Sequence, residues 1–279
     1  MTDVCDIRVI REVLGRHGFH FSKSKGQNFL TDGHIPERMA QAAGLTPSTG
    51  VLEIGPGMGA LTRSLCARAG HVTALELDEK LLPVLAETME GFDNLTVVQG
   101  DVLKTDLGAF PATVACANLP YNITTPAITA LLSCRRFTKI LVMVQREVAQ
   151  RICARPGTSE YGAFTVFCRH YAQAETLFNV PASSFTPRPK VESAVVAFLP
   201  NETPLLPRDD DLVLRLSRAA FGQRRKTLAN ALSSGFGISK ERLTSCVAGL
   251  GHDPNIRGEA LSYEQFVKLA ERIGEEFHV

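Results

Sequence analysis

The spacing in this chain that points most directly to chemistry is a glycine-rich turn followed by a carboxylate. An apolar run leads into Gly55 and Gly57 of the sequence GPGMG, and Glu76 follows 21 positions after Gly55. Glycines let the backbone bend sharply and let a ligand approach main-chain atoms. A carboxylate at Glu76 can accept hydrogen bonds from both ribose hydroxyls of an adenosine cofactor. The pattern favours S-adenosylmethionine, while Gly55-x-Gly57-x-x-Ala60 leaves a dinucleotide such as NAD open.

A second carboxylate adds to this candidate cofactor site. Asp101 follows the third β-rich run in VVQGDVL, and Val102 comes directly after it. The carboxylate can accept from an adenine amino group while Val102 packs on the ring; an Asp-containing turn is the structural alternative. Together with Gly55 and Glu76, Asp101 places polar groups for base and ribose on three successive strands. We therefore expect a cofactor that contains adenosine.

Asn118-Leu119-Pro120-Tyr121 ends the fourth β-rich run and could orient an adenine amino group. The Asn118 side-chain carbonyl and the Leu119 main-chain carbonyl can accept both hydrogens of N6. This arrangement directs the nitrogen lone pair, which is otherwise delocalised into the ring, toward a methyl donor. Pro120 stiffens the turn, and Tyr121 can stack on the base. A structural turn with a core tyrosine is the less favoured alternative.

The elements that must position these residues follow from the hydrophobic pattern. Apolar strands separated by helices predict a mainly parallel, Rossmann-like sheet in an α/β domain, with ligands at the carboxyl ends of the strands. The pattern predicts strands at 51–54, 72–77, 95–99, 113–117 and 140–144, and helices at 60–69, 79–89, 126–132 and 163–171.

The last third of the chain changes character. Two β-like runs at 175–180 and 192–199 predict a hairpin at the end of the sheet, and the Pro-rich stretch 200–207 reads as a linker. Helices are expected at 211–221, 226–233, 239–250 and 263–273, the last with a Ser262/Gln265 capping box and Gly274 as its C-cap. We expect a methyltransferase-type α/β domain at 1–200 and a small all-helical domain at 201–279.

Composition limits the class of protein. The 279 residues include 30 Lys+Arg and 29 Asp+Glu, a formal charge of +1, with 44% hydrophobic residues. This argues against a uniformly basic nucleic-acid binder and against a disordered acidic chain. No apolar run approaches a membrane span, the first residues lack a signal-peptide core, and seven scattered cysteines include no CxxC pair. We expect a cytoplasmic protein with reduced thiols, no membrane association and no metal site.

Several ordered segments resemble a known family. They are SKGQNFL (24–30), LEIGPGMGALT (52–62), ELD (76–78), GDVL (100–103), NLPYNITTP (118–126), VQREVAQR (144–151), SSFTPRPKVESAVV (183–196) and FGQRRKTLANAL (221–232). Through nearly the whole chain they resemble the ribosomal RNA adenine N6-dimethyltransferases, most closely the bacterial small-subunit type. The resemblance implies a Rossmann-like fold, S-adenosyl-L-methionine as cofactor, and N6,N6-dimethylation of two adjacent adenosines in a hairpin loop near the 3′ end of 16S rRNA.

The resemblance also implies roles for individual residues. Gln27, Asn28 and Leu30 would close over the methionine and sulfonium side of the cofactor, and Gly55 would contact its amino-acid moiety. Phe185 would be a second aromatic residue, packing against the target base opposite Tyr121, although an aromatic in a Pro-rich loop is as often a packing anchor.

An RNA substrate gives the basic segments a role that composition alone does not. Arg188 and Lys190 flank the Phe185 loop, and Arg224, Arg225 and Lys226 begin a helix of the predicted C-terminal domain. A run of charge is more often a solvated face, but an expected nucleic-acid substrate reverses that preference for the basic residues as a set. The expected partner is small-subunit rRNA in an immature subunit, bound by a monomer.

Other functions stay open at this level. A large-subunit rRNA adenine N6-methyltransferase of the antibiotic-resistance type shares the cofactor and NLPY segments. A ribosome-assembly factor that acts mainly by binding belongs to a different class, and a NAD-linked oxidoreductase is a third. The FGQRRKTLANAL segment favours the small-subunit enzyme, with a role in subunit biogenesis.

Overall fold

The chain divides into two compact units, which are described separately. In the computed structural model, residues 3–19, 27–201 and 207–277 are described, with the backbone alone for 207–211. One unit comprises Met1–Ala149 with Glu175–Pro200, and the other Gln150–Ala174 with Asn201–Val279. The first part of SKGQNFL and most of the predicted linker lie outside the described residues. No described helix has the length and apolar composition needed to cross a bilayer.

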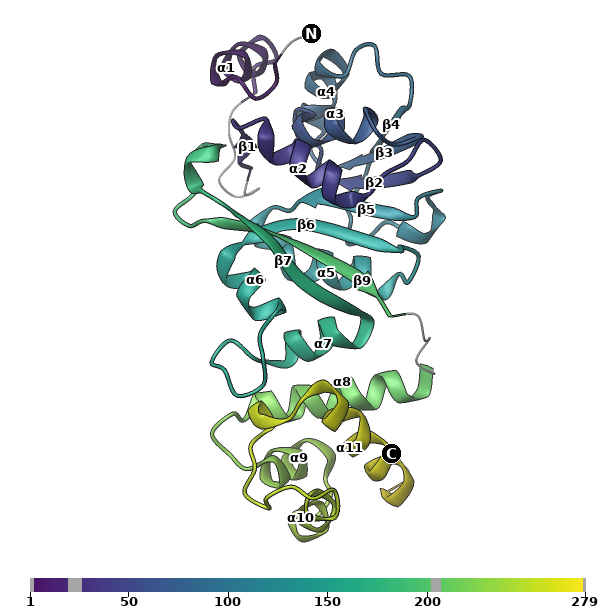
Figure 1. The fold of residues 1–279 in the computed structure, drawn as a ribbon, viewed down its shortest axis with the longest axis vertical. Coiled ribbons are helices and arrows are strands. Elements are labelled where there is room, and N and C mark those ends of the chain that lie inside the picture. Colours follow the sequence, from purple (N-terminus) through teal and green to yellow (C-terminus); the bar gives the residue numbers. More distant parts are fainter. Residues whose placement is uncertain (1–2, 20–26, 202–206, 278–279) are drawn as a thin grey trace. The chain divides into compact units, whose positions relative to one another are not determined.

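The first unit contains a mixed sheet that confirms the α/β prediction (Figure 1). Its strand order is β4-β3-β2-β5-β6-β9-β7, with β2 to β6 parallel and β9 antiparallel to β6. The predicted runs at residues 175–180 and 192–199 correspond to the neighbours β7 and β9. The strands are β2 (Gly50–Ile54), β3 (His71–Glu76), β4 (Leu95–Gln99), β5 (Val114–Asn118), β6 (Lys139–Gln145), β7 (Ala172–Val180) and β9 (Ser193–Pro200).

Strand register brings the carboxyl ends of the parallel strands together. Ile54 of β2 pairs with Leu75 of β3 and with Ala117 of β5, so the turns after β2, β3 and β5 share one edge. The chain order reverses at β2, whose neighbours are β3 and β5. Such a switch point is where open α/β sheets bind ligands. The Gly55 turn, Glu76 and Asn118 all lie there.

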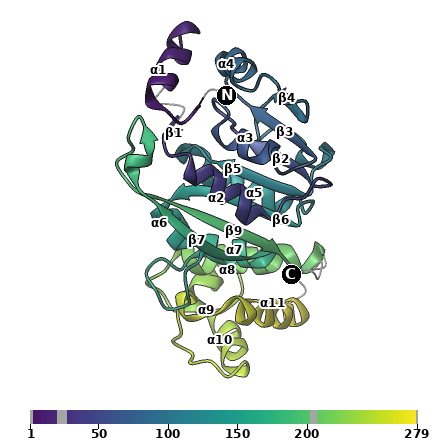
Figure 2. The same ribbon diagram turned by 45° about the horizontal axis from the view of Figure 1, so that its top comes forward.

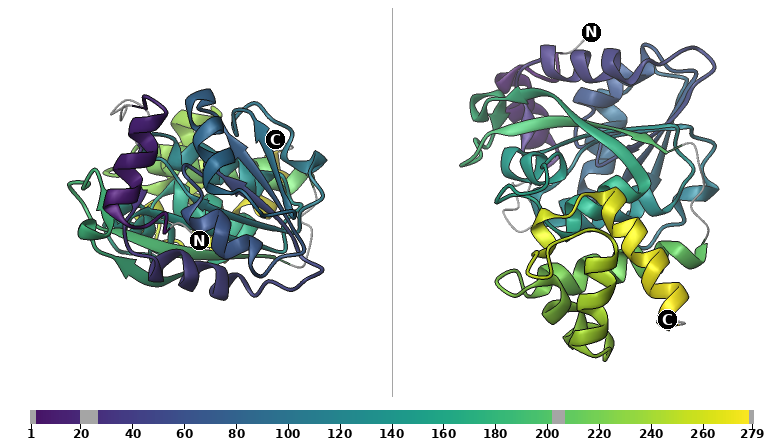
Figure 3. Two further views of the ribbon diagram at one scale, coloured as in Figure 1. Left: turned by 90° about the horizontal axis from the view of Figure 1, so that it is seen from above. Right: turned by 60° about the horizontal axis from the view of Figure 1, so that its bottom comes forward.

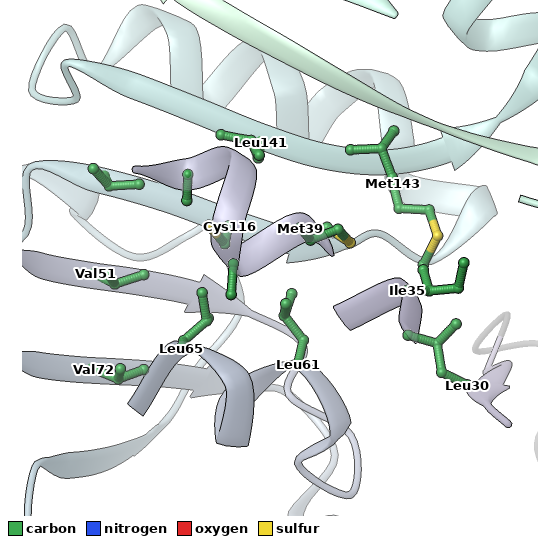
Figure 4. Packing of buried hydrophobic residues seen from close by; sticks show 14 of the residues in the cluster. Leu30, Ile35, Met39, Val51, Leu61, Leu65, Val72, Cys116, Leu141 and Met143 are labelled. Atoms are coloured by element: carbon green, nitrogen blue, oxygen red, sulfur yellow. The ribbon is translucent and has the colours of Figure 1, made fainter. Parts of the chain in front are cut away.

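Helices cover both faces of this sheet. Parallel crossovers are right-handed, and with this strand order the rule places α3 (Ala60–Cys66) and α4 (Leu82–Thr88) on one face and α5 (Thr124–Ser133) on the other. Figure 2 shows α3 beside β2 and β3, and α4 beside β4. On the first face α2 (His34–Ala43) packs against α3, and Figure 4 shows Met39 of α2 near Leu61 and Leu65 of α3. Leu61 belongs to this hydrophobic cluster and also lines the pocket described in the next section, so the cluster packs directly against the pocket wall.

An N-terminal helix that the sequence analysis did not predict packs on the same unit. The helix α1 (Ile7–Arg16), purple in Figure 3, buries Ile10, Val13 and Leu14 in a separate cluster that contains Phe29 and Leu81. A two-residue strand, β1 (Phe29–Leu30), then pairs antiparallel with β8 (Phe185–Thr186). The segment that begins at residue 27 is thereby held by the α1 cluster through Phe29 and by β8 through strand pairing.

The second unit is helical and has its own core, formed by α7 (Ala163–Tyr171), α8 (Pro207–Gly222), α9 (Leu228–Phe236), α10 (Lys240–Gly249) and α11 (Tyr263–Phe277). Residues 150–174, expected in the first domain, group with this unit because Tyr161 and Val166 pack into the helical core. A further helix, α6 (Arg146–Ile152), spans the division.

The two ends of α11 differ in how well the sequence predicted them. Its capping box is present: Ser262 N donates to Gln265 Oε1 at 2.7 Å, and Gln265 N donates to Ser262 Oγ at 3.3 Å. Gly274 does not end the helix, which continues to Phe277. The Arg242 guanidinium lies 4.2 Å from the Phe277 ring, a contact that stabilises the extra turn.

Candidate active site

A single pocket at the carboxyl ends of β2, β3 and β5 collects most of the residues that the sequence analysis selected. Its wall also includes Glu53, Phe29, Asp78 and Asn122, which the sequence analysis assigned no role. The selected residues that line the pocket are Gln27, Asn28, Leu30, Gly55, Gly57, Glu76, Asp101, Val102, Asn118, Leu119, Pro120 and Tyr121.

The glycine turn after β2 leaves room for a ligand. Gly55 has φ +68°, and a Cβ built on it would meet no heavy atom within 4 Å, so a side chain there would enter the pocket space. Gly57 has φ +60°, and its Cβ would lie 3.2 Å from the Phe29 ring. Phe29 therefore closes over the turn from the N-terminal segment, which only the tertiary structure reveals.

Glu76 closes the opposite side of the turn. Its side chain is 5% exposed, and its two carboxylate oxygens accept from backbone N–H groups, Oε1 from Asp78 at 2.8 Å and Oε2 from Gly57 at 3.3 Å. Burial raises the pKa of Glu76, and these two hydrogen bonds oppose the rise. Each carboxylate oxygen has two lone-pair directions, so Glu76 can bind hydroxyl groups and keep its backbone contacts.

Gln27 is tied to the end of β3. Its Nε2 donates to Asp78 Oδ2 at 2.9 Å, which puts the amide beside the Glu76 turn. Asp78 is 5% exposed and ties this segment to the end of β3. The sequence signal for Asp78 is the run ELD, in which the carboxylate comes two positions after Glu76.

Asp101 forms both the turn and the wall of the pocket. Its Oδ1 accepts from Leu103 N at 2.9 Å, the Asp-containing turn that was the structural alternative. Asp101 also lines the pocket together with the buried Val102. The turn fixes the carboxylate at the pocket edge, so the structural and the binding interpretations are compatible.

Glu53 is a buried carboxyl group in the pocket wall. It is 1% exposed, and Oε2 has no hydrogen-bond partner among the described residues. Burial, with a smaller contribution from the negative charge of Glu76, raises the pKa of Glu53 to about 8. The carboxyl group is therefore largely protonated at neutral pH.

Asn118 ends β5 with its amide already oriented. Its Nδ2 donates to the Asn28 main-chain carbonyl at 3.4 Å, which leaves the acceptor oxygen Oδ1 on the other arm of the amide. The next residue, Leu119, donates its N–H to the Met143 carbonyl at 3.1 Å, and Thr124 Oγ1 donates to the Pro120 carbonyl at 3.2 Å. The NLPY turn is thus fixed to neighbouring backbone.

Phe185 occupies a packing position, the alternative that the sequence analysis left open. Its side chain is 4% exposed, belongs to the main hydrophobic cluster and is not part of the pocket wall. Its backbone pairs with Leu30 in a separate two-stranded sheet, so Phe185 holds the N-terminal segment against β8. The strand pairing decides this orientation, and two-residue strands carry no sequence periodicity that would predict it.

The residues expected to contact RNA are all exposed: Arg188, Lys190, Arg224, Arg225 and Lys226. Arg224 also makes contacts within its own unit: its guanidinium donates to the Ser159 and Tyr161 carbonyls at 3.1 Å and lies 3.4 Å from Glu259 Oε2.

Comparison with known proteins identifies relatives over nearly the whole chain. A family model described as "Ribosomal RNA adenine dimethylase" matches residues 18–275. Proteins named "Ribosomal RNA small subunit methyltransferase A" are similar to this chain: that of Streptococcus pyogenes is 43% identical, covering 98% of both chains, and that of Streptococcus equi subsp. zooepidemicus is 44% identical, covering 97% of this chain and 98% of the relative.

Solved structures are also similar to this chain. A dimethyladenosine transferase from Plasmodium falciparum superposes with a TM-score of 0.76 at 29% identity, covering 88% of this chain and 97% of that chain. The 23S rRNA methyltransferase ErmE superposes with a TM-score of 0.70 at 27% identity, covering 88% and 98%. With a family model that matches almost its full length and relatives above 40% identity, the chain belongs to the ribosomal RNA adenine dimethylase family.

Proposed function

We propose that this protein dimethylates N6 of two adjacent adenosines in a hairpin loop near the 3′ end of 16S rRNA. S-adenosyl-L-methionine is the cofactor, and the protein is an rRNA adenine dimethyltransferase of the small-subunit type. The observation that carries the proposal is the Asn118 amide, whose nitrogen is engaged by Asn28 and whose oxygen remains as an acceptor in the pocket wall.

The pocket fits an adenosine cofactor by its own chemistry. A buried carboxylate, a turn without side chains at Gly55 and an apolar residue beside Asp101 match ribose, amino-acid moiety and adenine in turn. Glu76 would hold the ribose, Asp101 with Val102 the adenine, and Gly55 with the segment from Gln27 to Leu30 the methionine part. The cofactor supplies an electrophilic methyl group.

The residues of the NLPY turn orient the acceptor nitrogen. The Asn118 oxygen and the Leu119 main-chain carbonyl accept the two N6 hydrogens, so the nitrogen lone pair turns out of conjugation and toward the cofactor side. Pro120 fixes the turn, and Tyr121 stacks on the base. Catalysis by these groups is positioning and electrostatic stabilisation, with no strong general base.

The target base must leave its stack to reach this pocket, which favours an adenosine in a loop. Arg188, Lys190, Arg225 and Lys226 would bind phosphates, and Arg224 would support the helical unit that contributes to rRNA binding. We assign the substrate to an immature small subunit, bound by a monomer in the cytoplasm, where the seven free cysteines stay reduced. A role in subunit biogenesis follows from the substrate.

Methyl transfer from labelled cofactor to unmodified ribosomal subunits tests this function. Label in adenosines of small-subunit rRNA, as N6,N6-dimethyladenosine, is the expected result. Label confined to large-subunit rRNA would favour the alternative that the likeness to ErmE supports. A protein that binds the small subunit tightly without transferring label would instead be an assembly factor.

A further inference from the structure

Tyr121 is tied to a buried serine that lies outside the NLPY turn and outside the pocket wall. The Tyr121 hydroxyl oxygen lies 2.8 Å from Ser193 Oγ. Ser193 is completely buried and is the first residue of β9. It stands 72 positions from Tyr121, so no local pattern in the sequence connects the two residues.

The backbone around Ser193 is fixed from both directions. Ser193 pairs with Gln145 at the carboxyl end of β6. The preceding residue, Glu192, accepts from Arg146 N at 2.9 Å through its main-chain carbonyl and from Arg146 Nη1 at 2.6 Å through its carboxylate. These contacts place the Ser193 hydroxyl at a defined point beside the NLPY turn.

Two anchors then define the Tyr121 ring. The ring is attached to the turn at one end, where Pro120 and the Thr124 hydroxyl fix the backbone. Ser193 holds the hydroxyl at the other end. Fixing both ends sets the direction of the ring axis, and because the phenolic O–H bond prefers the plane of the ring, the hydrogen bond to Ser193 also limits rotation about that axis. Burial raises the pKa of Tyr121, and the phenol therefore stays protonated as a hydrogen-bonding group at neutral pH.

We infer that Ser193 is a positioning residue for methyl transfer, which fixes the plane of the Tyr121 ring on which the target adenine stacks. This inference rests on the proposed function, because it requires Tyr121 to contact the base. Ser193 touches neither the pocket nor the glycine turn, so its loss should act on the RNA substrate and leave the cofactor unaffected.

The test compares full-length Ser193→Ala, Tyr121→Phe and the double variant on unmodified small subunits. Each single variant should lower kcat/KM for the subunit about three- to tenfold, the range of one neutral hydrogen bond. The double variant should have a kcat/KM no lower than that of the less active single variant, because both substitutions remove the same hydrogen bond. The calorimetric Kd for S-adenosyl-L-methionine should stay within twofold of the unsubstituted protein.

Two further variants separate positioning from general damage. Ser193→Thr keeps the hydroxyl and should restore most of kcat/KM. Ser217→Ala removes a serine that is 1% exposed and bonded within its own helix to the Leu214 carbonyl at 2.9 Å, and it should leave kcat/KM unchanged. If Ser193→Ala fails to fold, Tyr121→Phe decides: a three- to tenfold loss supports the inference, and unchanged activity overturns it.

Tyr121→Ala separates this inference from the proposed function. If Tyr121→Ala transfers methyl groups at the normal rate, Tyr121 does not contact the base and its role in the proposed function is wrong. If Tyr121→Ala is strongly impaired while Ser193→Ala is normal, or if the two single effects add in the double variant, the positioning role of Ser193 is overturned and the proposed function stands.

Discussion

The cofactor end and the reacting end of the pocket are built in different ways. At the cofactor end, Gly57 in the turn after β2 and Glu76 at the end of β3 contact each other across 19 positions of sequence. At the reacting end, Asn118 depends on Asn28, 90 positions away, and Tyr121 on Ser193, 72 positions away. Adjacent parallel strands and a glycine turn shape the first, whereas distant segments must come together to shape the second.

This difference separates binding from reactivity. The cofactor end consists mainly of adjacent strand ends, with Phe29 and Gln27 of the N-terminal segment in contact with them. The reacting end depends in addition on β9, through the hydrogen bond between Tyr121 and Ser193. Substitutions at the two ends should therefore change different measured quantities, cofactor affinity at one and transfer rate at the other.

Asn118→Ala should break the reacting end with the largest effect. Loss of the amide oxygen removes an acceptor of the N6 hydrogens, and we expect transfer to fall at least about a hundredfold. Cofactor Kd should change less than threefold, because the Glu76 side is untouched. Single-turnover methylation and calorimetry measure the two quantities, with the exposed Asn255→Ala as control. Normal transfer by Asn118→Ala would refute the role of this amide.

Glu76→Gln should break the cofactor end. A buried carboxylate that accepts hydroxyl hydrogen bonds contributes about 1.5–3 kcal/mol, so cofactor Kd should rise roughly ten- to a hundredfold. Transfer at saturating cofactor should recover most of its rate. Glu79→Gln, an exposed carboxylate three positions later, should leave Kd unchanged. Equal effects of the two substitutions would show that Glu76 does not bind the cofactor.

A matched pair of glycines tests how far backbone geometry shapes the cofactor end. Gly59 and Gly91 both have φ +88°, but a Cβ on Gly59 would lie 2.7 Å from Met89 Sδ, whereas one on Gly91 meets nothing within 4 Å. Both alanine variants carry about 1 kcal/mol of left-handed strain. Gly59→Ala should lose about 1–3 kcal/mol more in urea unfolding, since it also overpacks the core. Equal losses would mean that Met89 moves aside freely.

The buried Glu53 at the cofactor end should make the free energy of unfolding depend on pH. Folding raises its pKa from 4.5 to about 8, so the folded protein keeps a proton that the unfolded chain has released. The resulting contribution to stability is complete below pH 4.5 and is lost as the pH rises toward 8. Glu53→Gln should flatten the fall in unfolding free energy across this window. Urea unfolding at several pH values measures the slope; parallel profiles would contradict the raised pKa.

Features set by residues close together in the sequence could be predicted, and features set by contacts between distant residues could not. The strand at 95–99 and the helix at 163–171 have the predicted bounds, because short apolar runs and local periodicity decide them. The pairing of Leu30 with Phe185 has no local signal, and it turns Phe185 into a packing residue. Residues 150–174 likewise group with the helical unit through Tyr161 and Val166, whose neighbours lie far along the chain.

By itself, the sequence determined the family, the order of the motifs at the carboxyl ends of the strands, and the pocket-lining residues Gly55, Glu76 and Asp101. Each of these is written in residues close together in the chain or at a fixed strand-to-strand spacing. Only the tertiary structure decided that Gln27 binds Asp78, that Arg224 contacts residues of its own unit, and that Asn118 and Tyr121 are hydrogen-bonded to Asn28 and Ser193. A hydrogen bond between distant residues depends on packing that no short stretch of sequence contains.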